Sequence, residues 1–436
     1  MVWVGIDDTD APTGGCTTWA MTEVVRIARA HGLDPIGPPR LVRLNPNIPW
    51  KTRGNAALGA HFGHGVGRAT VIGAIDGRPV RAFARGRRPS ARTRRAFVAD
   101  VWERLRAAAP RVRGTDPALV VTDRPPPAHL YWSAVRSVVG VRDNRARLRR
   151  LGLETHHRGS ARGLIGAAAA LAWPARWSSW ELIAYRPTDR WGTPRRVDST
   201  SVRRAQRRYP SLFLCHDPRT RRLLVAPHTP CPILFGLRGR TFVPVRAARE
   251  VVRSEAVDRW LVFRTNQGSG DHLVERPLRR IGPFEAGIVA GAVVAGPRRL
   301  AGGHVAFDLE DRRGDRATCV AFEPTKVLPR AAAALRPGDR VTVWGSRGAG
   351  ATVRLEGIRV DRLGPRRRTT KPRCARCGRA TGSLGRGRGY RCPSCRRRWP
   401  PEAATSVAVP TPLRDGTSYH PTASARRHLA PLAPER

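Results

Sequence analysis

Long apolar stretches are missing from this chain of 436 residues. No run of roughly 18 apolar residues occurs, and the sequence does not open with a basic segment followed by an apolar run. Neither a membrane span nor a signal peptide is therefore expected. We predict a cytoplasmic protein with no membrane partner.

Lysine and acidic residues are also scarce. Only three of the 80 cationic residues are lysine, and 33 acidic residues leave a net charge of +47. Codon bias can produce such an arginine excess, so the positive charge is weaker evidence for a polyanionic partner than its size suggests. The surplus still lies on surfaces, where it attracts polyanions and makes their binding depend on salt. Nucleic acid is the partner that this charge favours.

The spacing of the cysteines is not that of a small secreted protein held by disulfides. Four of the eight cysteines, Cys16, Cys215, Cys231 and Cys319, lie far apart in the sequence, and we expect them to be reduced.

The other four cysteines form two closely spaced pairs, Cys374-x-x-Cys377 and Cys392-x-x-Cys395. Two such thiolate pairs can complete a tetrahedral Zn²⁺ site, and with all four positions filled by protein the zinc is structural. Arginines surround the quartet, which favours an arm that grips RNA; a merely solvated zinc ribbon is the alternative.

The length predicts three or four domains in an α+β multidomain fold. A stretch of three prolines suggests a boundary near Pro125, and the composition of residues 78–95 suggests a mobile basic loop before a helix at 92–108. The expected units are 1–125, 126–275, an OB-fold barrel at 282–363, a zinc ribbon at 370–400 and a C-terminal tail at 401–436.

The barrel is predicted from five short strands, which are separated by residues typical of turns. We expect one helix, at 325–335, between the third and fourth strands, which is the order of a five-stranded Greek-key OB barrel. The expected strands are 286–295, 304–309, 317–322, 340–344 and 352–360. Such barrels commonly bind single-stranded nucleic acid.

An acidic loop follows the first expected strand, and a helix is predicted from Thr17 to Ala30 behind it. Asp7, Asp8 and Asp10 are hard oxygen ligands that suit Mg²⁺ with nucleotide phosphates. Gly14 and Gly15 then let the backbone approach closely, and the helix start at residues 16–18 favours phosphate. A polar turn in which Thr17 caps the helix is the other interpretation.

These residues resemble a known family, the archaeal agmatinylcytidine synthetases that modify the isoleucine tRNA with a CAU anticodon. The resemblance spans nearly the whole chain. Its marks are GIDDTD (5–10), CTT (16–18), RLNPNIPWKTRGN (43–55), DSTS (198–201), PHTPCPILFGLRG (227–239), TNQ (265–267), GGHV (302–305), FEPTK (322–326) and ARRHL (425–429). Thr229 stands where glycine is expected, and the arginine content is unusually high.

The resemblance implies a kinase-like first domain that binds ATP and a ferredoxin-like second domain. It further implies that ATP activates C2 of the wobble cytidine and that the amine of agmatine then displaces the activated oxygen. Thr18 matches the threonine that the family autophosphorylates. A monomer is expected.

Roles follow for three groups of residues. The proposed catalytic residues are Asp7, Asp8, Asp10 and Thr18, and those proposed to bind ATP or its phosphates are Thr9, Gly14, Gly15, Cys16, Thr17 and Lys51. Agmatine needs oxygen acceptors for its guanidinium, and Asp198, Ser199 and Thr200 are the candidates; a capped turn is the alternative for these three.

Two competing functions remain open at this stage. One is a different ATP-dependent RNA ligase or kinase that uses another amine. The other is a non-catalytic RNA-binding translation or assembly factor, in which the acidic loop is only a turn.

Overall fold

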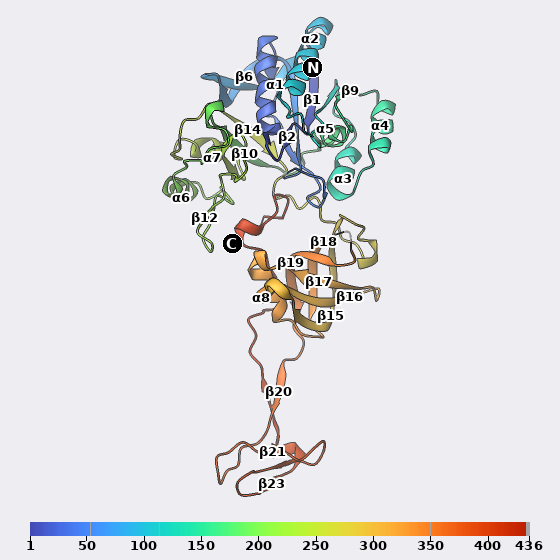
Figure 1. Ribbon diagram of the computed structural model, residues 1–436, viewed down its shortest axis with the longest axis vertical. Coiled ribbons are helices and arrows are strands. Elements are labelled where there is room, and N and C mark those ends of the chain that lie inside the picture. The colour runs from blue at the N-terminus through green and yellow to red at the C-terminus, as the bar shows by residue number, and fades with distance from the viewer. Residues whose placement is uncertain (53, 113, 349, 433–436) are drawn as a thin grey trace.

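The structure is a computed structural model that describes residues 1–52, 54–112, 114–348 and 350–432. Arg53 of the motif at 43–55 and the last four residues of the expected tail lie outside these ranges. Figure 1 shows a large upper body, a barrel below it and a thin arm that ends in a small lobe.

A ten-stranded sheet forms the centre of the upper body. Its strands are β1 (Val2–Asp7), β4 (Asp34–Pro35), β5 (Arg40–Arg43), β6 (Ala56–Ile75), β7 (Arg78–Arg87), β8 (Ala118–Thr122), β9 (Glu154–His157), β10 (Ser179–Tyr185), β13 (Ile233–Gly239) and β14 (Arg259–Thr265). The order is β13-β10-β14-β5-β6-β1-β8-β9, with β4 and β7 paired to β6 outside this path.

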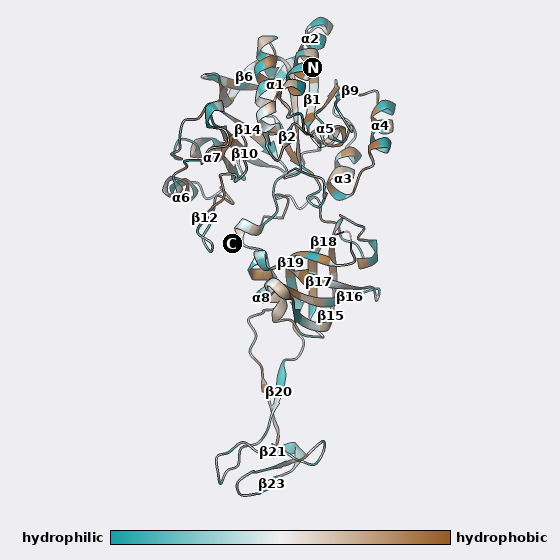
Figure 2. Ribbon diagram, in the orientation of Figure 1, coloured by the Kyte–Doolittle hydropathy of each residue, from teal (hydrophilic) through white to brown (hydrophobic). Residues whose placement is uncertain are grey.

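Helices cover the sheet on both faces. They are α1 (Thr17–Ala30), α2 (Ala91–Ala108), α3 (His129–Arg136), α4 (Val141–Arg150), α5 (Gly163–Ala172), α6 (Ser199–Arg208) and α7 (Phe242–Ala248). Val4 and Ile6 of β1 pack with α1 and α2 in one apolar core, while α3 and α5 share a second core with Val42 and Val120. Figure 2 shows the apolar strands between these helices.

The alanine-rich helix α5 lies directly against β1. A Cβ on Gly5 would stand 2.2 Å from the carbonyl oxygen of Ala167, so only glycine permits this close approach. The start of α5 is thereby held next to the end of β1.

One sheet runs through both of the first two expected domains. β10, β13 and β14 enclose a separate core with α6 and α7, and β14 pairs in parallel with β5. A short hairpin of β11 (His216–Asp217) and β12 (Arg222–Leu223) lies beside this core.

Residues 78–95 are not the basic loop that the sequence suggested. Arg78–Arg87 form β7, which pairs antiparallel with β6 from Ile75 back to His64. Val80 and Ala82 are buried while Arg81 is exposed, so the two-residue period of a strand is present beneath the arginine and proline content. The helix expected at 92–108 is confirmed as α2.

The five-stranded barrel is confirmed. Its strands are β15 (Ala286–Arg299), β16 (Val305–Asp311), β17 (Arg316–Ala321), β18 (Arg340–Arg347) and β19 (Val353–Arg362). The order is β17-β16-β15-β18-β19, and a parallel pairing of β17 with β19 closes the barrel. The helix α8 (Val327–Ala333) lies between the third and fourth strands, as predicted.

The arm leaves the barrel as a two-stranded ribbon of β20 (Arg367–Thr370) and β24 (Thr405–Ala408). Its lobe holds a small sheet of β21 (Gly382–Ser383), β22 (Tyr390–Arg391) and β23 (Arg398–Trp399). The short 3-10 helices of the described ranges are η1 (Thr188–Arg190), η2 (Leu278–Arg280), η3 (Ala301–Gly303), η4 (Glu323–Thr325), η5 (Pro401–Ala403), which lies in the arm, and η6 (Ala423–Ala425).

The C-terminal segment returns from the arm and ties the barrel to the upper body (Figure 1). It adds β25 (Ser418–Tyr419) to the barrel beside β19. Further on, the carbonyl oxygens of His428 and Leu429 each accept a hydrogen bond of 2.8 Å, from the N–H groups of Gly268 and Gly270. Arg427 pairs with Glu356 of the barrel at 3.4 Å and also contacts Asn47.

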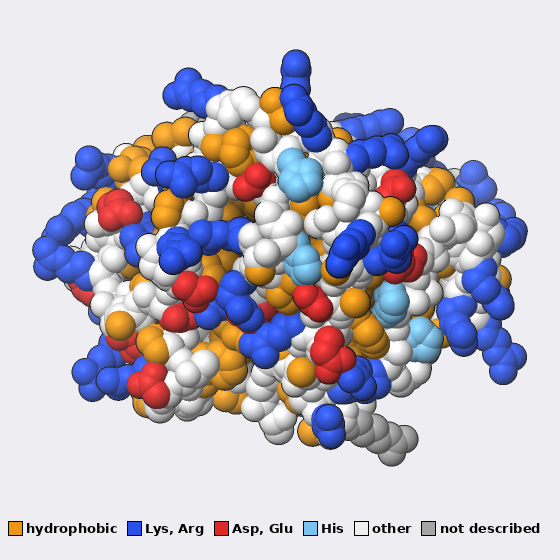
Figure 3. Space-filling view, turned by 90° about the horizontal axis from the view of Figure 1, so that it is seen from above, with side chains coloured by type: hydrophobic (Ala, Val, Ile, Leu, Met, Phe, Trp, Pro, Cys, Tyr) orange, Lys and Arg blue, Asp and Glu red, His pale blue; other side chains and the backbone are white. Residues whose placement is uncertain are grey.

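On the face seen from above, basic side chains are spread out rather than gathered in one patch (Figure 3). None of the helices in the described part of the chain is long and apolar enough to cross a membrane.

Glu23 of α1 joins the two halves of the upper body. Its side chain is almost fully buried and accepts hydrogen bonds from Arg26 (3.0 Å), Arg104 (2.8 Å) and Arg259 of β14. Burial opposes ionisation of this carboxyl, but the three arginines outweigh burial and lower its pKa below the ordinary 4.5. The contribution of Glu23 to stability is therefore present above pH 4.5 and is lost as the pH falls through the lowered pKa.

Glu23→Gln is expected to reduce the free energy of unfolding by about 3 kcal/mol at pH 7, because it removes a nearly buried charge that pairs with three arginines, of which Arg259 is only 12% exposed. Between pH 5 and 3 the variant should also lose less unfolding free energy than the wild type. The difference between the two losses should be about what one carboxyl contributes. Urea unfolding at several pH values measures both effects. Glu103→Gln, at an exposed ion pair with Arg106, is the matched control, with a change below about 0.5 kcal/mol. Equal losses in the two variants would contradict this role.

Candidate active site

The acidic loop folds as a tight hairpin between β1 and α1. Its two short strands are β2 (Asp10–Ala11) and β3 (Gly14–Gly15). Gly15 has a φ of +73°, and a Cβ there would stand 2.6 Å from the carbonyl oxygen of Thr9, so glycine is required. The predicted strand, loop and helix are thus present, and α1 begins at Thr17 as expected.

The three carboxylates Asp7, Asp8 and Asp10 line one cavity of about 290 Å³. Its other walls are residues from 44–52 and 54–56, the turn 137–141 between α3 and α4, and the first turn of α5. Lys51 lies in the same wall. We call this space the acidic cavity.

Two of these carboxyls resist ionisation in the protein alone. Burial, with the neighbouring charge of Asp8, raises the pKa of Asp7 well above its ordinary value. Burial likewise raises the pKa of Asp8 to about 7, although Asp8 accepts a hydrogen bond of 3.2 Å from the N–H of Asp116. A cluster of carboxylates with this property favours a bound cation, and its hard oxygen donors fit Mg²⁺.

The first turn of α5 closes the acidic cavity beside these carboxylates. A Cβ on Gly166 would stand 1.9 Å from Oδ2 of Asp7, and one on Gly163 would stand 3.1 Å from the Cβ of Asp8. Two glycines three residues apart on one helix face therefore make room for the acidic loop. Arg162 precedes them and lines the same cavity.

These α5 residues were missed by the sequence reasoning, which placed the anion site at the start of α1. The available signal was the pair Gly163 and Gly166 in a helix made otherwise of alanine, leucine and isoleucine. Such spacing marks a close approach, but it does not reveal what approaches.

Thr9, Gly15 and Cys16 face away from the acidic cavity, whereas Thr17 contacts one of its aspartates. Thr17 donates a hydrogen bond of 3.4 Å to Asp10, and the Thr18 Oγ1 and Cys16 Sγ atoms lie 3.0 Å apart. Thr9, Gly15 and Cys16 line a second cavity of about 680 Å³, which also contains Trp19 and Trp191. The structure thus separates the predicted phosphate-binding residues into two groups, one with the aspartates and Lys51 and one behind the hairpin.

Lys51 makes backbone contacts at the mouth of the acidic cavity. Its ammonium donates to the carbonyl oxygens of Pro46 and Ile48, the latter at 3.4 Å. Burial, with the charge of Arg427, lowers its pKa. A role for Lys51 in phosphate binding stays a prediction.

Motifs that lie far apart in the sequence meet in a buried polar network. Glu181 of β10 pairs with Arg43 at 2.9 Å and with Arg238 at 3.0 Å. Burial opposes ionisation of Glu181, but Arg238 and Arg43 outweigh it and lower its pKa. Asn266 exchanges hydrogen bonds with the backbone of Arg43, at 2.7 and 2.9 Å.

His428 from the C-terminal segment completes this network. The charge of Arg43, followed by burial, lowers its pKa well below the ordinary value, so His428 is neutral there. The motifs at 43–55, 227–239, 265–267 and 425–429 therefore share one location.

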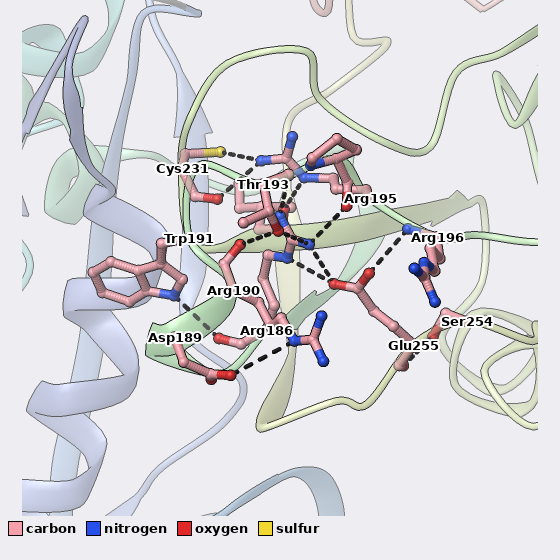
Figure 4. Close-up of polar contacts among 12 residues, drawn as sticks. Arg186, Asp189, Arg190, Trp191, Thr193, Arg195, Arg196, Cys231, Ser254 and Glu255 are labelled. Carbon is pink, nitrogen blue, oxygen red and sulfur yellow. Dashed lines mark hydrogen bonds and ion pairs between the residues drawn. The ribbon is translucent and has the colours of Figure 1, made fainter.

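The candidate agmatine residues form the start of α6. Asp198 caps this helix, accepting hydrogen bonds from the N–H groups of Thr200 (2.8 Å) and Ser201 (3.2 Å). The preceding loop is held by arginines: Arg186 pairs with Glu255, and Arg195 donates to Cys231 and neighbouring carbonyls (Figure 4). The observed contacts are those of a capped turn, and a role in binding agmatine stays a prediction.

Asp198→Ala separates the two roles of this residue. Loss of the cap is expected to reduce the free energy of unfolding by about 1 kcal/mol. Asp198→Ser keeps a capping oxygen and should recover most of this loss. If Asp198 also binds agmatine, KM for agmatine rises in both variants. An unchanged KM in both would leave only the cap.

The cysteine quartet assembles in the lobe of the arm. The ligand atoms of Cys374, Cys377, Cys392 and Cys395 all lie within 4.8 Å of one another. This donor set suits tetrahedral Zn²⁺ with no open position, which agrees with a structural site.

Comparison with known proteins gives matches along the chain. Three family models match: the TiaS TCKD domain at residues 3–159, the TiaS FLD domain at 161–272 and the TiaS C-terminal zinc ribbon domain at 371–409. The first two meet near residue 160, whereas the sequence suggested a boundary near Pro125.

Full-length relatives give the same result. TiaS of Methanopyrus kandleri, a 2-agmatinylcytidine synthetase for the second isoleucine tRNA, is 35% identical over 99% of this chain and 96% of its own length. The enzyme of the same name from Methanosarcina mazei is 34% identical over 99% and 97%.

Two solved structures are also similar to this chain. A crystal structure of TiaS in complex with the second isoleucine tRNA and ATP is 32% identical, with a TM-score of 0.85, and covers 98% of this chain and 95% of its own. A complex of TiaS with the same tRNA, AMPCPP and agmatine is 30% identical, with a TM-score of 0.81, over 99% and 96%. The chain belongs to the TiaS family of isoleucine tRNA agmatinylcytidine synthetases.

Proposed function

We propose that this protein uses ATP to join agmatine to C2 of the wobble cytidine in the isoleucine tRNA with a CAU anticodon. The observation that carries the proposal is the acidic cavity, where Asp7, Asp8 and Asp10 meet the first turn of α5. The relatives whose complexes contain the second isoleucine tRNA, ATP and agmatine cover almost the entire chain. The modified base then pairs with A instead of G, which permits decoding of AUA.

The acidic cavity is the proposed site of phosphoryl transfer, in a first unit that we propose to be kinase-like. Asp7, Asp8 and Asp10 would hold Mg²⁺, which supplies charge neutralisation at the phosphates. The positive end of the α5 helix dipole, together with Arg162, favours the transferring negative charge. This positions ATP between the hairpin and α5.

The chemical order follows from the leaving group. An amide-like C2 oxygen leaves poorly until it is phosphorylated, so phosphoryl transfer to this oxygen precedes attack by the amine. The amine of agmatine then bonds to C2, and the phosphate departs with the former C2 oxygen. A base stacked in the anticodon loop is inaccessible, so the cytidine must turn out into the protein.

Thr18 is the proposed site of autophosphorylation. Its hydroxyl lies 3.0 Å from the Sγ atom of Cys16. The second unit, which we propose to be ferredoxin-like, supplies Glu181 and Arg238 and the agmatine candidates at 198–200. Phosphopeptide mass analysis after incubation with ATP tests this directly, because Thr18→Ala should abolish the modified peptide.

The deciding experiment is nucleoside mass analysis of the CAU tRNA after incubation with ATP and a panel of amines. Agmatine incorporation at the wobble cytidine is the expected result. Incorporation of another amine alone would favour a different ligase of this scaffold. ATP-independent tRNA binding with no modified nucleoside would favour the non-catalytic RNA-binding factor.

A further inference from the structure

The rim of the acidic cavity carries exposed apolar side chains. Trp50 is 49% exposed and Val138 is 42% exposed, and both line this cavity. The guanidinium of Arg162 lies 4.3 Å from the centre of the Trp50 ring, and Phe284 approaches it edge-on with 6.4 Å between the ring centres. An indole fixed on one side and accessible on the other is a suitable surface for a stacked base.

The helix α4 begins at the same rim. Its first residue, Val141, lines the acidic cavity, and the helix continues along the outside of the upper body (Figure 1). Asn144 and Leu148 are buried against the body. The opposite face carries Arg142, Arg145 and Arg149, which are exposed. Arg145 and Arg149 follow Arg142 by three and seven residues, so the three side chains form one stripe along the helix, about 10 Å long.

The charge of this stripe is not neutralised by the protein. Across the described residues, none of the five arginines of α4 forms an ion pair, whereas Arg94, Arg104 and Arg106 of α2 are all paired with acidic residues. The helix contains a single acidic residue, Asp143, in its first turn. Figure 2 shows α4 as one of the most hydrophilic helices of the upper body. An unpaired arginine stripe is complementary to a phosphate backbone.

The geometry points to a docking surface for single-stranded RNA that continues from the acidic cavity. In this arrangement Trp50 stacks on a base next to the nucleotide that enters the cavity, and Arg142, Arg145 and Arg149 hold the backbone phosphates on one side of it. The inference rests on the proposed function, since it takes the anticodon loop as the occupant. It adds positioning residues that hold the loop while the flipped nucleotide reacts.

The test of the stripe uses a hairpin RNA with the anticodon stem and loop of the CAU isoleucine tRNA, so that contacts elsewhere on the tRNA do not contribute. The variant is Arg142→Gln, Arg145→Gln and Arg149→Gln in the full-length protein. Its affinity for the hairpin should fall by about tenfold or more. The slope of log affinity against log salt should decrease by about 2, because each contact with a single strand contributes about 0.7.

The matched control removes the same charge from α6, which lies on the opposite side of the upper body (Figure 1). Its substitutions are Arg204→Gln, Arg207→Gln and Arg208→Gln; these arginines are exposed, and α6 does not line the acidic cavity. This control should leave hairpin affinity within about twofold. Equal effects of the two triple variants would overturn the inference, because they would show only a general loss of charge.

Trp50 is tested by Trp50→Ala and Trp50→Phe with the same hairpin. The alanine variant should raise KM for the RNA about tenfold, and the phenylalanine variant should restore it, since a ring is what stacking needs. A change in KM for ATP without a change for RNA would overturn the stacking role.

Failure of this inference is distinguishable from failure of the proposed function. If the wild type incorporates agmatine but the α4 and α6 variants bind the hairpin equally, only the docking surface fails. If the wild type does not incorporate agmatine, the hairpin comparison still decides whether α4 binds RNA.

Discussion

Asp8→Asn is expected to lower kcat for agmatine incorporation by roughly 10²- to 10³-fold while tRNA affinity stays within about twofold. The carboxylate lies in the acidic cavity next to Asp7, and the start of α5 approaches its Cβ. Asparagine keeps the size of the side chain but removes the charge that holds a divalent cation. The loss therefore falls on phosphoryl transfer and not on binding of the RNA.

Thermal unfolding gives a second readout of this variant. Without Mg²⁺, Asp8→Asn should be at least as stable as the wild type, because burial and like charges already raise the pKa of Asp8 to about 7. Addition of Mg²⁺ should raise Tm of the wild type and have little effect on the variant. Asp189→Asn, at an exposed carboxylate of η1, is the matched control for both measurements. Full activity of Asp8→Asn would contradict the assigned site.

Cys374→Ser, or removal of the metal by a chelator, is expected to unfold the lobe of the arm while the barrel and upper body stay folded. None of the hydrophobic clusters found in the described ranges includes a residue between 364 and 412, so the lobe has no apolar core of its own. A structural zinc site contributes about 10 to 16 kcal/mol in small domains, and here it replaces that core. The loss of the lobe should also remove its arginines from any contact with tRNA.

Limited proteolysis measures this outcome. New cleavage should appear between residues 365 and 411, with the main unfolding transition unchanged. Ser394→Ala lies between two of the cysteines without supplying a ligand, and it should remain resistant. A lobe that stays protected after complete loss of metal would contradict the structural role of the site.

Local sequence patterns were enough to predict the elements whose residues lie close together in the sequence. Short-range periodicity or spacing predicted three of them. They are the helix at Thr17–Ala30, the five-stranded barrel with α8 between its third and fourth strands, and the cysteine quartet. β7 was the exception, because its arginines and proline obscured an alternation that only the pairing with β6 makes evident.

The acidic loop shows most clearly which features depend on the sequence alone and which depend on the tertiary structure. The sequence by itself determined that three carboxylates follow a buried strand and precede a helix, because these are properties of neighbouring residues. Only the tertiary structure brought α5 to them from a distant part of the chain and turned Cys16 toward a different cavity. It likewise joined Arg43, Glu181, Arg238 and His428 in one network. The physical reason is that strand order and close backbone approach set these contacts, and neither leaves a periodic signal in the sequence.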